Sequence, residues 1–416
     1  MNFYKKALYF TSKYFSIVRN VSALFSIKTI DLCLSLWLIP FLISKVGIEN
    51  YGLYAFAMAL TLFFVNVLNY GFNLTTVREI AQSSKDTETL QRIFNEVFSV
   101  KLILFFALLI AFLLLTFAVP SFYKFKTLYF CCSLLLVADL FSLRWFFMGI
   151  EKMQFMAGIH FLGTLSFVFG ALLFINLPED FIFIPLFEAI GLFLTSSISF
   201  VWVVKKYNFK LSFLGVTFVF KYLKSNFSSF INLLLPSTYN TILIFMVGLV
   251  GLPSYVAFTK IGVRIAGAFS TLNTILTNVF YPLVSRNTKV MSRVRLILNN
   301  IGLLSTFLMF LSSYVIHYWI PFDSEANLQT TITIIQYLSV LPFFMAIISS
   351  YGVNGLLIIG QDALYGKISF FTFIAMVLAS FLLIPSLEIF GGVLALLLGR
   401  FLSAFLSFLN YKYKSI

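Results

Sequence analysis

Long apolar runs constrain the fold of this chain more than any other feature. Twelve stretches of about 20 residues contain almost only apolar side chains, and each is long enough to cross a bilayer core of about 30 Å as a helix. They lie approximately at residues 22–44, 51–72, 98–119, 127–148, 155–177, 181–204, 227–249, 255–281, 296–320, 330–351, 364–384 and 389–409. The pattern predicts an all-α integral membrane protein with twelve transmembrane helices.

Charge supports this prediction. Only 11% of the residues are charged, against about 25% in soluble domains. With both termini in the cytoplasm, 22 of the 29 basic residues, Lys101 among them, fall on cytoplasmic segments or helix ends, as the positive-inside rule requires. The net charge of +14 is spread over alternating loops and not gathered in one patch, so we do not expect nucleic-acid binding.

A weak internal repeat suggests how the helices are grouped. Residues 46–51, VGIENY, match residues 250–255, VGLPSY, and both hexapeptides lie in the turn after the first helix of a set of six. Transporters are often built from two related bundles with the pathway between them. The repeat predicts two six-helix bundles, residues 1–204 and 227–416, joined by a cytoplasmic linker at 205–226.

Cationic side chains within the apolar runs are the first candidates for a binding site. A charge in hydrocarbon is costly, so it normally faces a cavity or a partner. Lys260 and Arg264 lie four residues apart with no acid in their run, which favours an anionic ligand over snorkelling to the interface. Lys28 either neutralises Asp31 or joins that ligand site. Arg400 either pairs with an acid or lines the same cavity.

Two acids and several amides complete the candidate set. A desolvated carboxylate at Asp139 or Glu188 can take up H+ or Na+ and couple transport to a gradient, and Asp31 is a third candidate. The alternative is that these acids only balance Arg144 or Arg400. Asn69 and Asn73 lie near the inner end of their run, where amides suit either sugar hydroxyls or helix–helix hydrogen bonds.

Motifs for catalysis and for cofactors are absent from the sequence. It contains no phosphate-binding loop ending in Gly-Lys-Ser/Thr, no His-Glu-x-x-His and no nucleophile elbow. The three cysteines, Cys33, Cys131 and Cys132, lack metal-ligand spacing. We therefore expect neither an enzyme nor a resident cofactor or metal. The coupling ion that we expect is H+ or Na+.

Several short motifs give the chain a family resemblance. They are Tyr51-Gly52-Leu53-Tyr54, Tyr70-Gly71-Phe72-Asn73 and Arg78-Glu79, followed by residues 144–152, RWFFMGIEK, and by Gly360-Gln361. The run from Val46 to Ala81 resembles the hallmark region of the Wzx-type O-antigen flippases. These form the polysaccharide translocase family of the multidrug/oligosaccharidyl-lipid/polysaccharide (MOP) exporter superfamily.

The resemblance implies a V-shaped pair of six-helix bundles around a cationic cavity, in the bacterial cytoplasmic membrane. It implies that an oligosaccharide repeat unit on undecaprenyl pyrophosphate is flipped to the outer leaflet for O-antigen or capsule synthesis. Membrane lipids, a polysaccharide polymerase and a chain-length regulator are the other partners implied. Lys28, Lys260 and Arg264 then hold the pyrophosphate.

Other functions stay open at this point. A drug/cation antiporter of the same superfamily is expected to have an acidic cavity. A lipid II flippase typically has fourteen helices. A membrane polysaccharide polymerase or ligase normally needs a larger outward loop than this chain provides, and a passive scaffold does not need cations near the middle of the membrane.

Overall fold

The computed structural model describes residues 29–414, except for 31, 35, 74, 84–85, 287–289 and 323. Within these residues every regular element is a helix, and the all-helical prediction is confirmed. Two of the predicted site residues, Lys28 and Asp31, lie outside the described residues.

The chain forms two compact units. The first contains Leu68–Ala171 and Leu186–Phe230, together with the described residues up to Leu34. The second contains Ser35–Val67, Leu172–Pro185 and Ile231–Ile416. Segments of the two units therefore alternate along the sequence, and the predicted division into residues 1–204 and 227–416 stays a prediction.

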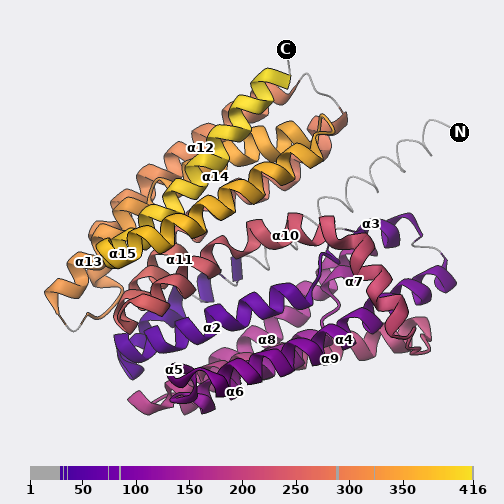
Figure 1. The fold of residues 1–416 in the computed structure, drawn as a ribbon, viewed down its shortest axis with the longest axis horizontal. Coiled ribbons are helices and arrows are strands. Elements are labelled where there is room, and N and C mark those ends of the chain that lie inside the picture. The colour runs from indigo at the N-terminus through magenta and orange to yellow at the C-terminus, as the bar shows by residue number, and fades with distance from the viewer. Residues whose placement is uncertain are drawn as a thin grey trace, which may run out of the picture. The chain divides into compact units, whose positions relative to one another are not determined.

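Helices of the first unit pack around aromatic side chains. They are α3 (Thr75–Gln82), α4 (Thr87–Ala118), α5 (Pro120–Tyr123), α6 (Lys126–Leu140), α7 (Arg144–Gly149), most of α8 (Met153–Phe174) and most of α9 (Ile184–Tyr207). The α4 and α6 helices lie side by side (Figure 1). The fully buried ring of Phe94 lies 5.1 Å from that of Phe209 and 6.2 Å from that of Trp145. Offset contacts of this kind stabilise a core beyond simple burial.

The second unit contains most of the remaining helices. They are α2 (Ile48–Leu68), the 3-10 helix η1 (Pro178–Phe183), the latter part of α10 (Val216–Val250), α11 (Pro253–Arg286), α12 (Met291–Ser312), the 3-10 helix η3 (Ser313–Tyr318), α13 (Glu325–Leu338), α14 (Leu341–Ile347), the π-helix η4 (Ile348–Leu357) and α15 (Asp362–Lys414). In Figure 1, α12, α14 and α15 run alongside one another. This part of the chain is a bundle of long helices.

The last helix is broken in its middle. A helix of 53 residues would be about 80 Å long, more than twice the thickness of the hydrocarbon core. Glu388 has a positive φ of 51°, and Pro385, which lacks a backbone N–H, lies three residues earlier. The break falls between the predicted runs 364–384 and 389–409. Its Glu388 Oε2 accepts a hydrogen bond of 2.7 Å from the Tyr255 hydroxyl.

Nine helices in the described part of the chain are long and apolar enough to cross a membrane. They include α15 as one helix, and a shorter apolar helix lies at Leu32–Val46. The α11 helix covers the predicted run 255–281 but is not among the nine. A multi-pass membrane protein is confirmed, while the count of twelve spans stays a prediction.

Candidate functional site

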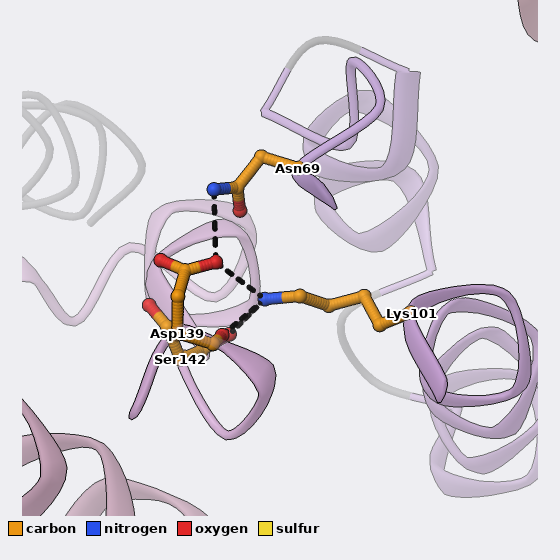
Figure 2. A network of polar contacts seen from close by, with 4 residues as sticks. All are labelled: Asn69, Lys101, Asp139 and Ser142. Atoms are coloured by element: carbon orange, nitrogen blue, oxygen red, sulfur yellow. Dashed lines mark hydrogen bonds and ion pairs between the residues drawn. The ribbon is translucent and has the colours of Figure 1, made fainter. Parts of the chain in front are cut away.

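A buried polar network lies in the first unit, where Lys101 of α4 meets the end of α6 (Figure 2). The Lys101 ammonium donates to the Asp139 backbone oxygen at 2.6 Å, to Asp139 Oδ2 at 3.3 Å and to the Ser142 backbone oxygen at 3.3 Å. Lys101 is 1% exposed and Asp139 is 7% exposed. An ammonium has three donors, so all three are satisfied.

The location of the ammonium follows from a break in the helix. The α6 helix ends at Leu140 and α7 begins at Arg144, although both belong to one candidate span, Lys126–Gly149. Carbonyl groups freed by a break inside a membrane must find donors within the protein. The carboxyl end of a helix also carries partial negative charge. Lys101 satisfies both requirements, because it binds the Ser142 carbonyl in the break, the Asp139 carbonyl in the last turn of α6 and the carboxylate beside them.

Asn69 joins this network from a tight turn. Its Nδ2 donates to Asp139 Oδ2 at 2.9 Å, as Figure 2 shows. The next two residues have positive φ angles, 30° at Tyr70 and 78° at Gly71. The Tyr70 ring stacks on Phe230 with centroids 4.3 Å apart, and its hydroxyl donates to the Leu223 backbone oxygen at 2.8 Å. The turn is therefore held by α10 while Asn69 points to the carboxylate.

This network corrects one interpretation and answers one open question. Lys101 does not lie at a helix end as predicted, since it is buried 14 residues after the start of α4. Its position inside the apolar run 98–119 was the signal that could have identified it. The carboxylate of Asp139 is balanced by Lys101, whereas Arg144 is exposed and forms no ion pair with it.

A second buried cation lies in the second unit. Arg400 of α15 is 8% exposed, and its guanidinium lies 4.0 Å from the centre of the Tyr239 ring. The Tyr239 hydroxyl shares a hydrogen bond of 2.7 Å with the Thr372 hydroxyl, which fixes the ring. No carboxylate in the described part of the chain forms an ion pair with Arg400. The predicted alternative of an acid partner is therefore not found there.

The other predicted residues are less enclosed. Lys260 is half-buried and Arg264 is exposed, four residues apart on α11 as the spacing predicted. Glu188 of α9 is half-buried, and these three side chains all have interactions with neighbours. Asn73 is exposed. Their roles in binding or coupling stay predictions. No group of three His, Cys, Asp or Glu residues suited to a metal ion occurs in the described residues.

Sequence comparison identifies the family. The family described as "Polysaccharide biosynthesis protein" matches residues 17–288, about two thirds of the chain. The chain is 24% identical over 362 residues to a protein of Escherichia coli (strain K12) named "Putative O-antigen transporter", covering 85% of this chain and 86% of the relative.

Solved structures share the fold. The lipid II flippase MurJ in an inward closed conformation has a TM-score of 0.74 at 15% identity, covering 95% of this chain and 87% of MurJ. An inward-facing multidrug resistance transporter of the MATE family, from the MOP superfamily, has a TM-score of 0.70 at 15% identity, covering 92% of this chain and 94% of that one. With two thirds of its length matched by the family, the chain belongs to the polysaccharide biosynthesis proteins, which here have the MOP superfamily fold.

Proposed function

We propose that this transporter flips an oligosaccharide linked to undecaprenyl pyrophosphate from the cytoplasmic to the outer leaflet, by alternating access, for synthesis of a surface polysaccharide. The family and the O-antigen name of the Escherichia coli relative support a polysaccharide substrate. The MurJ name supports a lipid-linked one. The observation that carries the proposal is Arg400, a buried cation in an apolar helix without an acid partner among the described residues.

A pyrophosphate supplies the charge that this environment lacks. The Tyr239 ring face offsets part of the positive charge on Arg400, but a neutral ring cannot neutralise it. Phosphate oxygens accept paired N–H bonds from a guanidinium, and these are among the strongest hydrogen bonds in proteins. Lys260 and Arg264 add cations on another helix. A cationic drug would be repelled by such a set, which disfavours the antiporter alternative.

For coupling we propose a proton bound at Asp139, with Glu188 as the second candidate. An ammonium already lies 3.3 Å from Asp139 Oδ2, so a sodium ion at that oxygen would be strongly repelled. Protonation of Asp139 removes the ion pair to Lys101 but leaves the two backbone acceptors of the ammonium in place. The break between α6 and α7 would then be held less tightly, which couples a proton to the conformation of these helices.

Flipping in liposomes tests the substrate and its site. The purified full chain is reconstituted with a fluorescent undecaprenyl-pyrophosphate oligosaccharide, and its appearance in the opposite leaflet is followed. Loss of charge-assisted bonds in Arg400→Gln should slow flipping roughly ten- to hundredfold. Arg400→Lys should restore it only in part, because lysine lacks the planar fork.

The matched control is Arg92→Gln, which removes the same charge from a side chain that is 68% exposed. It should flip at the wild-type rate. Normal flipping by Arg400→Gln would refute the assignment of Arg400. Chain elongation of the substrate in the same vesicles would instead reveal a polymerase. Imposing either a pH gradient or a sodium gradient identifies the ion, and acceleration by sodium alone would refute the proton proposal.

A further inference from the structure

Two lysines of the first unit converge on one tryptophan. Lys206, in the last turn of α9, has its Nζ 4.3 Å from the centre of the Trp202 ring. Lys152, in the turn between α7 and α8, has its Nζ 5.6 Å from the same ring. Phe155 and Phe147 pack on Trp202 at 4.3 and 5.6 Å between ring centroids, so the ring is fixed in place.

This arrangement carries excess positive charge. No carboxylate among the described residues forms an ion pair with Lys152 or Lys206. Contact with the Lys206 side chain lowers the pKa of the Lys152 ammonium, with a smaller contribution from desolvation and from the like charge. Each ammonium gains from the ring face, but the two repel each other. An anion placed between them would turn that repulsion into two favourable contacts.

The surface beside the two lysines is suited to an acyl chain. Leu194, Ile198 and Val201 lie at i, i+4 and i+7 on α9 and are each close to half exposed. Steps of i+4 lead from Leu194 through Ile198 to Trp202 and then to Lys206, with Val201 beside them. Tryptophan is enriched at the boundary between hydrocarbon and headgroups, and long basic side chains there extend toward the headgroups.

We propose that Lys152, Lys206 and Trp202 bind the phosphate of an anionic phospholipid of the surrounding bilayer, whose acyl chain lies along the Leu194–Ile198–Val201 stripe. The positive-inside rule places this end of α9 in the cytoplasmic leaflet, which is rich in anionic lipid. The apolar stripe favours a membrane lipid over free phosphate, because a soluble anion needs no such surface. The site is independent of Arg400 and of the proposed transport substrate.

Native mass spectrometry of the full chain in detergent tests this site. The probes are phosphatidylglycerol, phosphatidylcholine as the neutral lipid, and inorganic phosphate as competitor. Wild type should retain phosphatidylglycerol in preference to phosphatidylcholine, and phosphate should not displace it. With about 1 kcal/mol for each lysine near the headgroups, Lys152→Gln with Lys206→Gln should weaken phosphatidylglycerol binding by about 30-fold.

The control is Lys210→Gln with Lys221→Gln, which removes the same charge from two exposed lysines that lie outside α9 and not over Trp202. Binding in that variant should stay within about threefold of wild type. An equal loss in both double variants would mean general attraction to charge and would overturn the proposal. Unchanged binding in Lys152→Gln/Lys206→Gln, or displacement by inorganic phosphate, would overturn it as well. Gel filtration and a thermal melt establish that each variant is folded.

Discussion

At the scale of single residues, the ion pair of Lys101 and Asp139 has more consequence for stability than any exposed charge. The two residues are 38 positions apart in sequence, on α4 and α6, and both are almost fully buried. A buried pair contributes little compared with an apolar pair of the same shape, yet removing one partner leaves an uncompensated charge. The network therefore makes each charge depend on the other.

Lys101→Met should lower the free energy of unfolding on the order of 3–5 kcal/mol, because Asp139 then keeps only the Asn69 amide as a partner. Combining it with Asp139→Asn removes the orphaned charge and should recover a large part of that loss. Thermal and denaturant unfolding in detergent measure the three variants as a double-mutant cycle. A double variant that loses the sum of the two single losses would contradict the pairing.

The sequence could predict part of this site. Asp139 is recognisable because a carboxylate within an apolar run is expensive. Its partner is not recognisable from spacing, since the pairing depends on how α4 packs against α6. Arg400 shows the same limit, because cation and ring are brought together by the packing of α15 on α10. Asn69 looked equally suited to sugar or to packing, and only the turn at Tyr70 and Gly71 directs it to Asp139.

At the scale of elements, the apolar runs predict where helices lie but not where they break. The interruption between α6 and α7 requires a donor from α4, and the π-helix η4, which begins near the end of the predicted run 330–351, has no distinct sequence pattern. Local sequence does account for the turn after α2, because glycine adopts the positive φ that other residues avoid.

Gly71→Ala should destabilise this turn more than Gly215→Ala destabilises its own. Both glycines have positive φ, 78° and 83°, so each substitution costs about 1–2 kcal/mol in backbone strain. A Cβ at Gly71 would also lie 3.2 Å from the Phe230 backbone, whereas nothing lies within 4 Å at Gly215. Thermal melts of the two variants measure the difference. Equal losses would mean that the approach to Phe230 contributes nothing.

The start of α4 should depend on pH through Asp86. The Thr89 hydroxyl and nearby amides hydrogen-bond its carboxylate and hold the pKa of Asp86 below its ordinary 3.8. A lowered pKa means that the cap stabilises the helix above pH 3.8 and loses its effect as the pH falls through the folded-state pKa.

Hydrogen exchange at Glu88, corrected for the intrinsic effect of pH, should thus be severalfold faster in Asp86→Ala than in wild type at neutral pH. The two proteins should converge in acid. The control Glu179→Ala removes an exposed acid of η1 that takes no part in this cap. A difference between Asp86→Ala and wild type that persists below the pKa of Asp86 would contradict capping by the carboxylate.

At the scale of the whole molecule, composition and charge predicted an all-helical multi-pass membrane protein, and the resemblance of its short motifs implied the superfamily fold that the solved structures share. The number of membrane crossings does not follow directly from helix length and hydropathy, because these criteria count α15 as one element. A continuous crossing is physically excluded, since about 80 Å of helix greatly exceeds the hydrocarbon thickness. The break at Glu388 therefore has to lie at or beyond a membrane surface, where its carboxylate and the Tyr255 hydroxyl can meet water.

Reporter insertions into the full chain test this topology. Alkaline phosphatase is active only outside the cytoplasm. It should be active when inserted at Ser386, beside the break, and inactive when fused after Lys414. A fluorescent protein fused after Lys414 should instead be bright. An insertion at Phe213, in the predicted linker 205–226, is the cytoplasmic control. In the twelve-span topology α15 crosses the membrane once before the break and once after it. Only the second crossing lies between Ser386 and Lys414, so these two positions must report opposite sides. If both reported the same side, α15 would cross the membrane an even number of times between them, and the twelve-span topology with a cytoplasmic C-terminus would be wrong.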